Sequence, residues 1–254
     1  MKNISIRLRL TVIVILAALS AQAQQAMFLQ QGRIEFEKRV NQHARMDEMR
    51  NGQENSWTDA LRKSTSQYLV TYFDYSFSRN TSLYKPGRDN PDNKNPFGAT
   101  PAEVNIVYSR LDSMESISQK KVFEQTYLIK DSIRNIHWKI TEETRKIAGF
   151  DCRRANAVIM DSIYVVAFYT DAIITPGGPE SFSGLPGMIL GVALPHEHIT
   201  WFATKVLVDD IKAEALKPPS KGKETNAKGI KEDITKILGR WGNYGQAYIK
   251  AIML

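Results

Sequence analysis

The sequence contains a single cysteine, Cys152, so no disulfide can form within the chain. Packing alone must stabilise the core. We expect the thiol to be a small buried group at the start of a strand, because free cysteines are among the most buried residues of proteins. A reactive thiol, or one that pairs with another chain, is the alternative.

Sequence signatures of common catalytic sites are also missing. The chain has no Gly-x-Ser-x-Gly turn, no Gly-x-x-x-x-Gly-Lys phosphate loop and no His-Glu-x-x-His helix. Its acidic pairs, Glu142-Glu143 and Asp209-Asp210, are adjacent in sequence, so on a strand their carboxylates would point to opposite faces. We therefore predict no catalytic residue and no cofactor, and interpret the protein as a binding protein rather than an enzyme.

Long apolar runs are absent except near the N-terminus. Residues 10–19 are apolar apart from Thr11, they follow Lys2, Arg7 and Arg9, and Ala21-Gln22-Ala23 forms a cleavage signal. The pattern predicts a secretory signal peptide over residues 1–23 and a mature chain that begins near Gln24. Because the run is short for a membrane span, we expect an exported protein, periplasmic or associated with the outer membrane, with no transmembrane span after signal removal.

A strong excess of one charge is missing too. The formal charge of +7 falls to +4 when the three basic residues of the signal peptide leave, and the remaining basic residues are scattered except over residues 217–231. A mild charge and export both argue against a nucleic-acid partner.

The dominant pattern in the sequence is the alternation of polar and apolar residues. It predicts half-buried strands over residues 31–40, 68–73, 75–78, 104–109, 122–130, 136–141, 154–160, 163–170, 188–194 and 199–206. Short strands so close in sequence are typical of an antiparallel meander. We predict a mainly β (α+β) fold over residues 24–210, with a single curved antiparallel sheet or half-barrel.

Other segments interrupt or follow the strands. Residues 41–65 have loose helical spacing, which fits a helix or an ordered loop. Residues 85–103 carry four prolines, which predict an exposed loop. Residues 211–229 are rich in Lys, Gly and Pro and are typical of a flexible linker. Residues 230–254 have apolar groups at helical spacing, so we expect a short C-terminal amphipathic helix that docks on the domain or on a partner such as an outer-membrane protein.

Residues 178–190 combine three glycines and two prolines with an apolar run. Pro186 and Gly187 suit the two central positions of a type II turn, because proline fixes φ and glycine accepts a positive φ. The segment is either a rigid binding loop or a structural corner that joins two core strands.

These residues resemble the GLPGLI family of exported proteins from Bacteroidota. The resemblance covers roughly residues 30–210 and includes Trp138, residues 149–155 and residues 169–173. Its most specific positions are Gly178, Pro179, Phe182, Gly184, Leu185, Pro186, Gly187, Met188, Ile189 and Leu190. The chain departs from the family at Phe168, where a tryptophan is frequent, and at Gly191, where an acidic residue is frequent. The resemblance implies export and supplies no catalytic residue.

Strand order and compartment are also similar to periplasmic lipoprotein carriers, which hold acyl chains in a half-open barrel. By this analogy an aromatic groove in the sheet would hold an apolar small molecule, a lipid or a partner segment. The predicted lining residues are Tyr68, Tyr72, Phe73, Phe77 and Phe168. The alternative is a solid core that these aromatic side chains simply fill.

A histidine pair suggests a third possibility. His196 and His198 would point to the same face of an extended segment and could share a zinc or copper ion. The pair needs further ligands, for which His43, His137, Asp171 and Cys152 are the candidates.

Overall fold

The structure is a computed structural model that describes residues 28–49, 56–93 and 102–254. The predicted signal peptide and part of the predicted loop at 85–103 lie outside the described residues. In the part of the chain that is described, no helix is long and apolar enough to cross a membrane.

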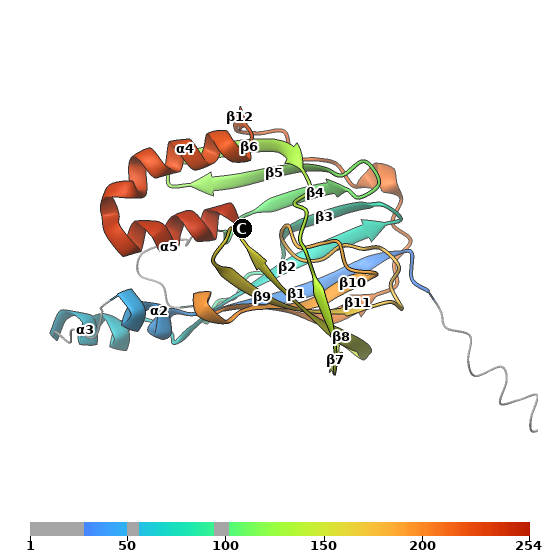
Figure 1. Cartoon of the computed structure of the whole chain (residues 1–254), viewed down its shortest axis with the longest axis horizontal. Helices are drawn as coiled ribbons and strands as arrows, with labels where there is room; N and C mark the ends of the chain where they lie inside the picture. Colours follow the sequence, from blue (N-terminus) through green and yellow to red (C-terminus); the bar gives the residue numbers. More distant parts are fainter. Residues whose placement is uncertain (1–27, 50–55, 94–101) are drawn as a thin grey trace, which may run out of the picture.

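Twelve strands form one sheet. In chain order they are β1 (Gln31–Asn41), β2 (Tyr68–Ser78), β3 (Thr81–Pro86), β4 (Ile106–Arg110), β5 (Glu115–Val122), β6 (Gln125–Ser132), β7 (Lys139–Ile147), β8 (Phe150–Ile159), β9 (Ile163–Thr170), β10 (Met188–Leu194), β11 (Ile199–Leu207) and β12 (Lys223–Thr225). The spatial order is β12-β6-β5-β4-β3-β2-β1-β11-β10-β9-β8-β7. Neighbours are antiparallel except β12 and β6, which are parallel. Figure 1 shows the sheet curving from β6 and β5 to β8 and β7 without closing. The predicted fold class is confirmed.

The alternation of buried and exposed residues along the strands places the core on the concave face of the sheet, as β1 illustrates. Ile34, Phe36, Lys38 and Val40 are buried on the concave face, while the residues between them are at least partly exposed. Cross-strand partners share a face, so Lys38 has Thr71 of β2 and Trp201 of β11 beside it inside the curve. On the concave face, β1 therefore contributes three apolar side chains to the main core together with the buried Lys38.

The loop between β9 and β10 fills much of the concave side. Phe182 and Leu185 are fully buried, and the ring of Phe182 lies 5.9 Å from that of Trp201 on β11. Trp138 Nε1 donates a hydrogen bond of 2.9 Å to the carbonyl of Ser183 and holds the loop from the other side. The sheet is filled rather than hollow over this part of its concave face.

The C-terminal segment packs against the opposite end of the sheet. It forms α4 (Ala227–Leu238), the 3-10 turn η4 (Gly239–Trp241) and α5 (Gly242–Met253). Ile230 and Ile234 of α4 and Ile249 of α5 form a second core with Val122 and Tyr127 of β5 and β6. Figure 1 shows α4 and α5 side by side near β6 and β5. The predicted amphipathic segment thus contains two helices and docks on its own sheet.

Several elements differ from the sequence-based expectation. β3 and β5 are additional strands, and the strand predicted over residues 122–130 corresponds mainly to β6, which follows a turn at Phe123-Glu124. In agreement with the helical spacing of residues 41–65, the described parts of that segment form α2 (Gln42–Met49) and α3 (Ser56–Ser64). The segment 211–229 contains η3 (Ala213–Ala215) and β12, which is paired with β6. The division into domains stays a prediction.

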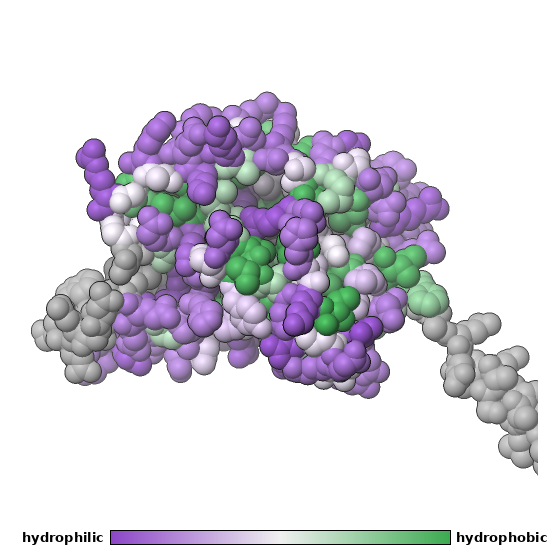
Figure 2. Space-filling model, viewed as in Figure 1, coloured by the Kyte–Doolittle hydropathy of each residue, from purple (hydrophilic) through white to green (hydrophobic). Residues whose placement is uncertain are grey.

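Polar and apolar side chains are largely separated. In the view of Figure 2 the surface is mainly hydrophilic, with apolar side chains in separate patches.

Cys152 is buried and free, and burial raises the pKa of its thiol to about 12. It therefore behaves as the small core residue that the sequence favours.

Candidate functional site

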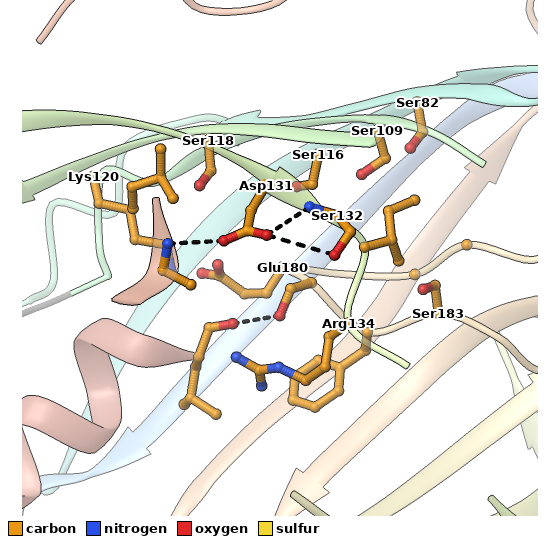
Figure 3. Close-up of a pocket in the computed structure, with 18 of the residues that line it drawn as sticks. Ser82, Ser109, Ser116, Ser118, Lys120, Asp131, Ser132, Arg134, Glu180 and Ser183 are labelled. Carbon is orange, nitrogen blue, oxygen red and sulfur yellow. Dashed lines mark hydrogen bonds between the residues drawn. The ribbon is translucent and has the colours of Figure 1, made fainter. Parts of the chain in front are cut away.

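One cavity of about 280 Å³ lies on the concave side of the sheet. Its walls come from β3, β4, β5 and β6, from the β9–β10 loop, and from the ends of α4 and α5. Figure 3 shows the polar side chains that converge on it. This volume is close to the lower limit for small-molecule sites, so the cavity suits a molecule no larger than a simple sugar.

A row of serines forms the floor of the cavity. Ser82, Ser109 and Ser116 are direct partners across β3, β4 and β5, and Ser116 faces Asp131 on β6. Because cross-strand partners share a face, four hydroxyl or carboxylate groups point to the same side in neighbouring positions. Ser118, two residues beyond Ser116, extends the row. Each hydroxyl can donate one hydrogen bond and accept two.

Two basic side chains close one end of the cavity. Lys120 Nζ donates a hydrogen bond of 2.9 Å to the carbonyl of Ile252, and Arg134 Nη2 donates one of 2.5 Å to the carbonyl of Met253. Both bonds satisfy carbonyls at the end of α5, where a helix leaves its last carbonyls without internal partners. Burial lowers the pKa of Lys120 to about 8 and also lowers the pKa of Arg134.

A buried carboxylate enters the cavity from the β9–β10 loop. Glu180 is 3% exposed, and its Oε2 accepts a hydrogen bond of 3.1 Å from Asn105 Nδ2. Its Oε1 is buried and has no hydrogen-bond partner among the described residues. The backbone of Glu180 has φ = 53°, a left-handed conformation that costs a non-glycine residue energy and is concentrated at functional sites.

The glycine- and proline-rich loop is held in place by the packing of its backbone. Gly187 has φ = 151°, and a side chain there would place its Cβ 2.1 Å from the carbonyl oxygen of Thr170. The predicted type II turn is wrong. The amide of Gly187 donates to the carbonyl of Leu185, two residues before it, and the amide of Met188 donates to Ile173 instead. The loop is therefore a packed corner that also presents Glu180 to the cavity.

The structure divides the predicted groove residues between two faces. Phe73 and Phe77 are fully buried on the concave face, whereas Tyr72 shares the convex face with Glu37 and Phe202. Tyr68 belongs to the convex side and is 44% exposed. Phe168 packs against Phe202 on that side as well. Adjacent residues such as Tyr72 and Phe73 cannot share one face of a strand, so these five aromatic side chains do not line a common groove.

The histidine pair also lies differently from the prediction. Residues 195–197 form the 3-10 turn η2 (Pro195–Glu197), and His198 has φ = 54°, so the segment is not extended. His198 Nε2 lies 2.9 Å from Glu48 Oε1, and His196 is exposed. Within the described ranges no group of three or more His, Cys, Asp or Glu side chains could hold a metal ion.

The sequence alone does not identify the residues of the cavity. Ser116, Ser118 and Lys120 do alternate along one strand, and this was the available signal. The alternation alone does not say that their side of β5 faces the inside of the curve. Glu180 lies in the glycine- and proline-rich segment 178–190, but nothing in its neighbours indicates that its carboxylate is buried.

Solved structures with a similar fold include two of PNGF-II. One, in space group C2, has a TM-score of 0.51 and 14% sequence identity and covers 80% of this chain. The other, in space group P21, has a TM-score of 0.52 and 15% identity and covers 82%. The matches cover 32% and 34% of the PNGF-II chains, so this chain spans about a third of their length. At this identity the similarity shows the fold alone.

Sequence comparison adds one match. No protein of curated function matches the chain. Residues 157–191, from the end of β8 through the β9–β10 loop into β10, match a family model described as "Protein of unknown function (Porph_ging)".

Proposed function

We propose that the protein is a non-catalytic binding protein that holds a small hydrophilic molecule in the concave cavity. The row of paired serines carries this proposal, because three neighbouring strands each place a hydroxyl on the cavity side. Empty cavities in protein cores are normally apolar, so these hydroxyls indicate a cavity that is occupied by water or by a polar molecule. The lining also contains apolar side chains, but an acyl chain would leave the hydroxyl and charged groups of the cavity unpaired, so we favour a hydrophilic ligand.

The wider family and location belong to the same proposal. The family model matches residues 157–191, and we propose that the resemblance to the GLPGLI family extends beyond them. The β9–β10 loop and Trp138, which donates a hydrogen bond to that loop, support this proposal. We also propose that the chain acts outside the cytoplasm, on the basis of its N-terminal pattern. Mass spectrometry of the exported protein is expected to find a chain that begins near Gln24, and retention of residues 1–23 would contradict export.

Isothermal titration calorimetry of the full chain tests the proposed binding. The probes are glucose and gluconate, which are hydrophilic, and octanoate, which is an acyl chain. We expect at least one hydrophilic probe to bind more tightly than octanoate. Ser109→Phe fills the cavity and should abolish this binding, whereas Tyr108→Phe changes the same strand on its other face and should preserve it.

Two outcomes would contradict the proposal. The first is the absence of binding by both hydrophilic probes. The second is binding that survives Ser109→Phe in a variant whose circular dichroism spectrum is unchanged, because the bound molecule would then lie elsewhere.

A further inference from the structure

The buried charges of the cavity keep bonding capacity that the protein does not use. Lys120 has three N–H donors, and one of them bonds to Ile252. Arg134 Nη1 is buried without a hydrogen-bond partner in the described part of the chain, and the same holds for Glu180 Oε1. Buried polar groups are normally paired, because an unsatisfied one costs free energy. A molecule in the cavity that offers acceptors to the two cations and a donor to Glu180 would remove this cost.

The surrounding charges favour an anionic group at the cationic end. Lys38, 3% exposed, is a third basic group that interacts with both Glu180 and Lys120, and burial lowers its pKa. Asp131 opposes them, but its carboxylate already accepts hydrogen bonds from the backbone amides of Ala227 and Ser132. The unused hydrogen-bonding capacity is therefore mainly that of the N–H donors of Lys120 and Arg134, with Glu180 Oε1 as one additional acceptor.

We propose that the cavity binds a hydroxylated carboxylate of sugar-acid size, with its carboxylate between Lys120 and Arg134 and its hydroxyls on Glu180 and the serine row. This inference rests on the proposed function and specifies its ligand class. Glu180 already faces Lys38 and Lys120, so a neutral hydroxyl is a better donor to it than a further ammonium group. The serines supply the matching donors and acceptors for the remaining hydroxyls.

Titration calorimetry of the full chain with gluconate, glucose and L-glutamine tests the ligand class. Gluconate has the hydroxyls and the carboxylate, glucose has the hydroxyls alone, and glutamine has a carboxylate with an ammonium group. We expect gluconate to bind at least about 10-fold more tightly than glucose, because charge-assisted hydrogen bonds are roughly twice as strong as neutral ones. We also expect it to bind more tightly than glutamine.

A matched pair of variants locates the carboxylate. Arg134→Gln should weaken gluconate binding by about 10-fold or more while it changes glucose binding little. Arg153→Gln removes an exposed arginine on β8 and should change neither. Should Arg134→Gln fail to fold, the unmodified protein provides a second measurement. Burial gives Lys120 a pKa of about 8, so gluconate affinity should fall as pH rises through that value while glucose affinity stays level.

Three results would overturn the ligand class. If glucose and gluconate bind equally and both are sensitive to Ser109→Phe, the binding function stands but the cavity does not recognise a carboxylate. Tighter binding of glutamine than of gluconate replaces the hydroxy acid by an amino acid. Failure of gluconate and glucose alike to bind contradicts both the ligand class and the proposed function.

Discussion

Replacement of Lys120 by methionine tests the energetic cost of the buried cation. The pKa of this lysine is lowered from its ordinary value of 10.5 to about 8, mainly by burial; Glu180 opposes the shift, and Arg134 and Lys38 add to it. Below pH 8 the ammonium is charged in both the folded and the unfolded chain, and the folded state bears the full cost. Between about pH 8 and 10.5 the unfolded chain binds more protons than the folded one, so stability rises with pH. At about 1.4 kcal/mol per pKa unit, the rise is about 3 kcal/mol.

The assay is urea unfolding of the wild type and Lys120→Met between pH 7 and 10.5. Titrating groups that do not interact with Lys120 contribute equally to both proteins and cancel in the difference between their free energies of unfolding. The variant also loses the hydrogen bond to Ile252, but that loss is independent of pH in the variant and only offsets the curve. We expect the wild type to gain about 3 kcal/mol over the variant as pH rises through this window. Lys121→Met, an exposed neighbour, should give a flat difference. If the difference in free energy of unfolding for Lys120→Met is also independent of pH, the claim that Lys120 is a buried cation with a lowered pKa is refuted.

Three further predictions concern packing. Gly187→Ala should lower the free energy of unfolding in urea by several kcal/mol, because the new Cβ would meet the Thr170 carbonyl. Gly149→Ala, where φ is 89° and the space is open, should lower it by about 1–2 kcal/mol. Equal losses would contradict the close approach at Gly187. Ile234→Ala should cost about 2–5 kcal/mol and the exposed Ile237→Ala less than about 1 kcal/mol, and a similar loss at both sites would argue against docking of α4 on the sheet. Cys152 should resist a thiol-specific disulfide reagent at pH 8 until the protein is unfolded in urea, and rapid labelling of the native chain would show that the thiol is accessible.

The sequence predicts the sheet well because its signal is local. Along β1 the polar and apolar residues alternate over the whole strand, and β8 to β11 end at clear turn residues. β3 is harder to predict, because it is short and ends at Pro86. The groove prediction failed for a physical reason. Aromatic content identifies strands, but only the period of two decides which face each ring occupies, and it separates Tyr72 from Phe73.

The cavity depends on long-range geometry that no single segment contains. Lys120 and Glu180 look like ordinary surface residues in sequence, since charged side chains are seldom buried. Their burial results from the curvature of the sheet and from the return of residues 252–254 to its inside. The carbonyls that accept from Lys120 and Arg134 lie more than a hundred residues away from them in the chain. Such pairs cannot be found from local patterns.

The position of β1 has a consequence for how the protein folds. Among the described strands, β1 lies between β2, which leads to β6 and β12, and β11, which leads to β7. Each of these two arcs consists mainly of neighbouring hairpins that can pair early, but their union needs Arg33 of β1 to meet Leu207 of β11. Closing so long a stretch of chain is slow, because its entropy is lost before the contacts form. We expect the nascent chain to hold two separate half-sheets until β11 has been made, with β1 as the strand that unites them.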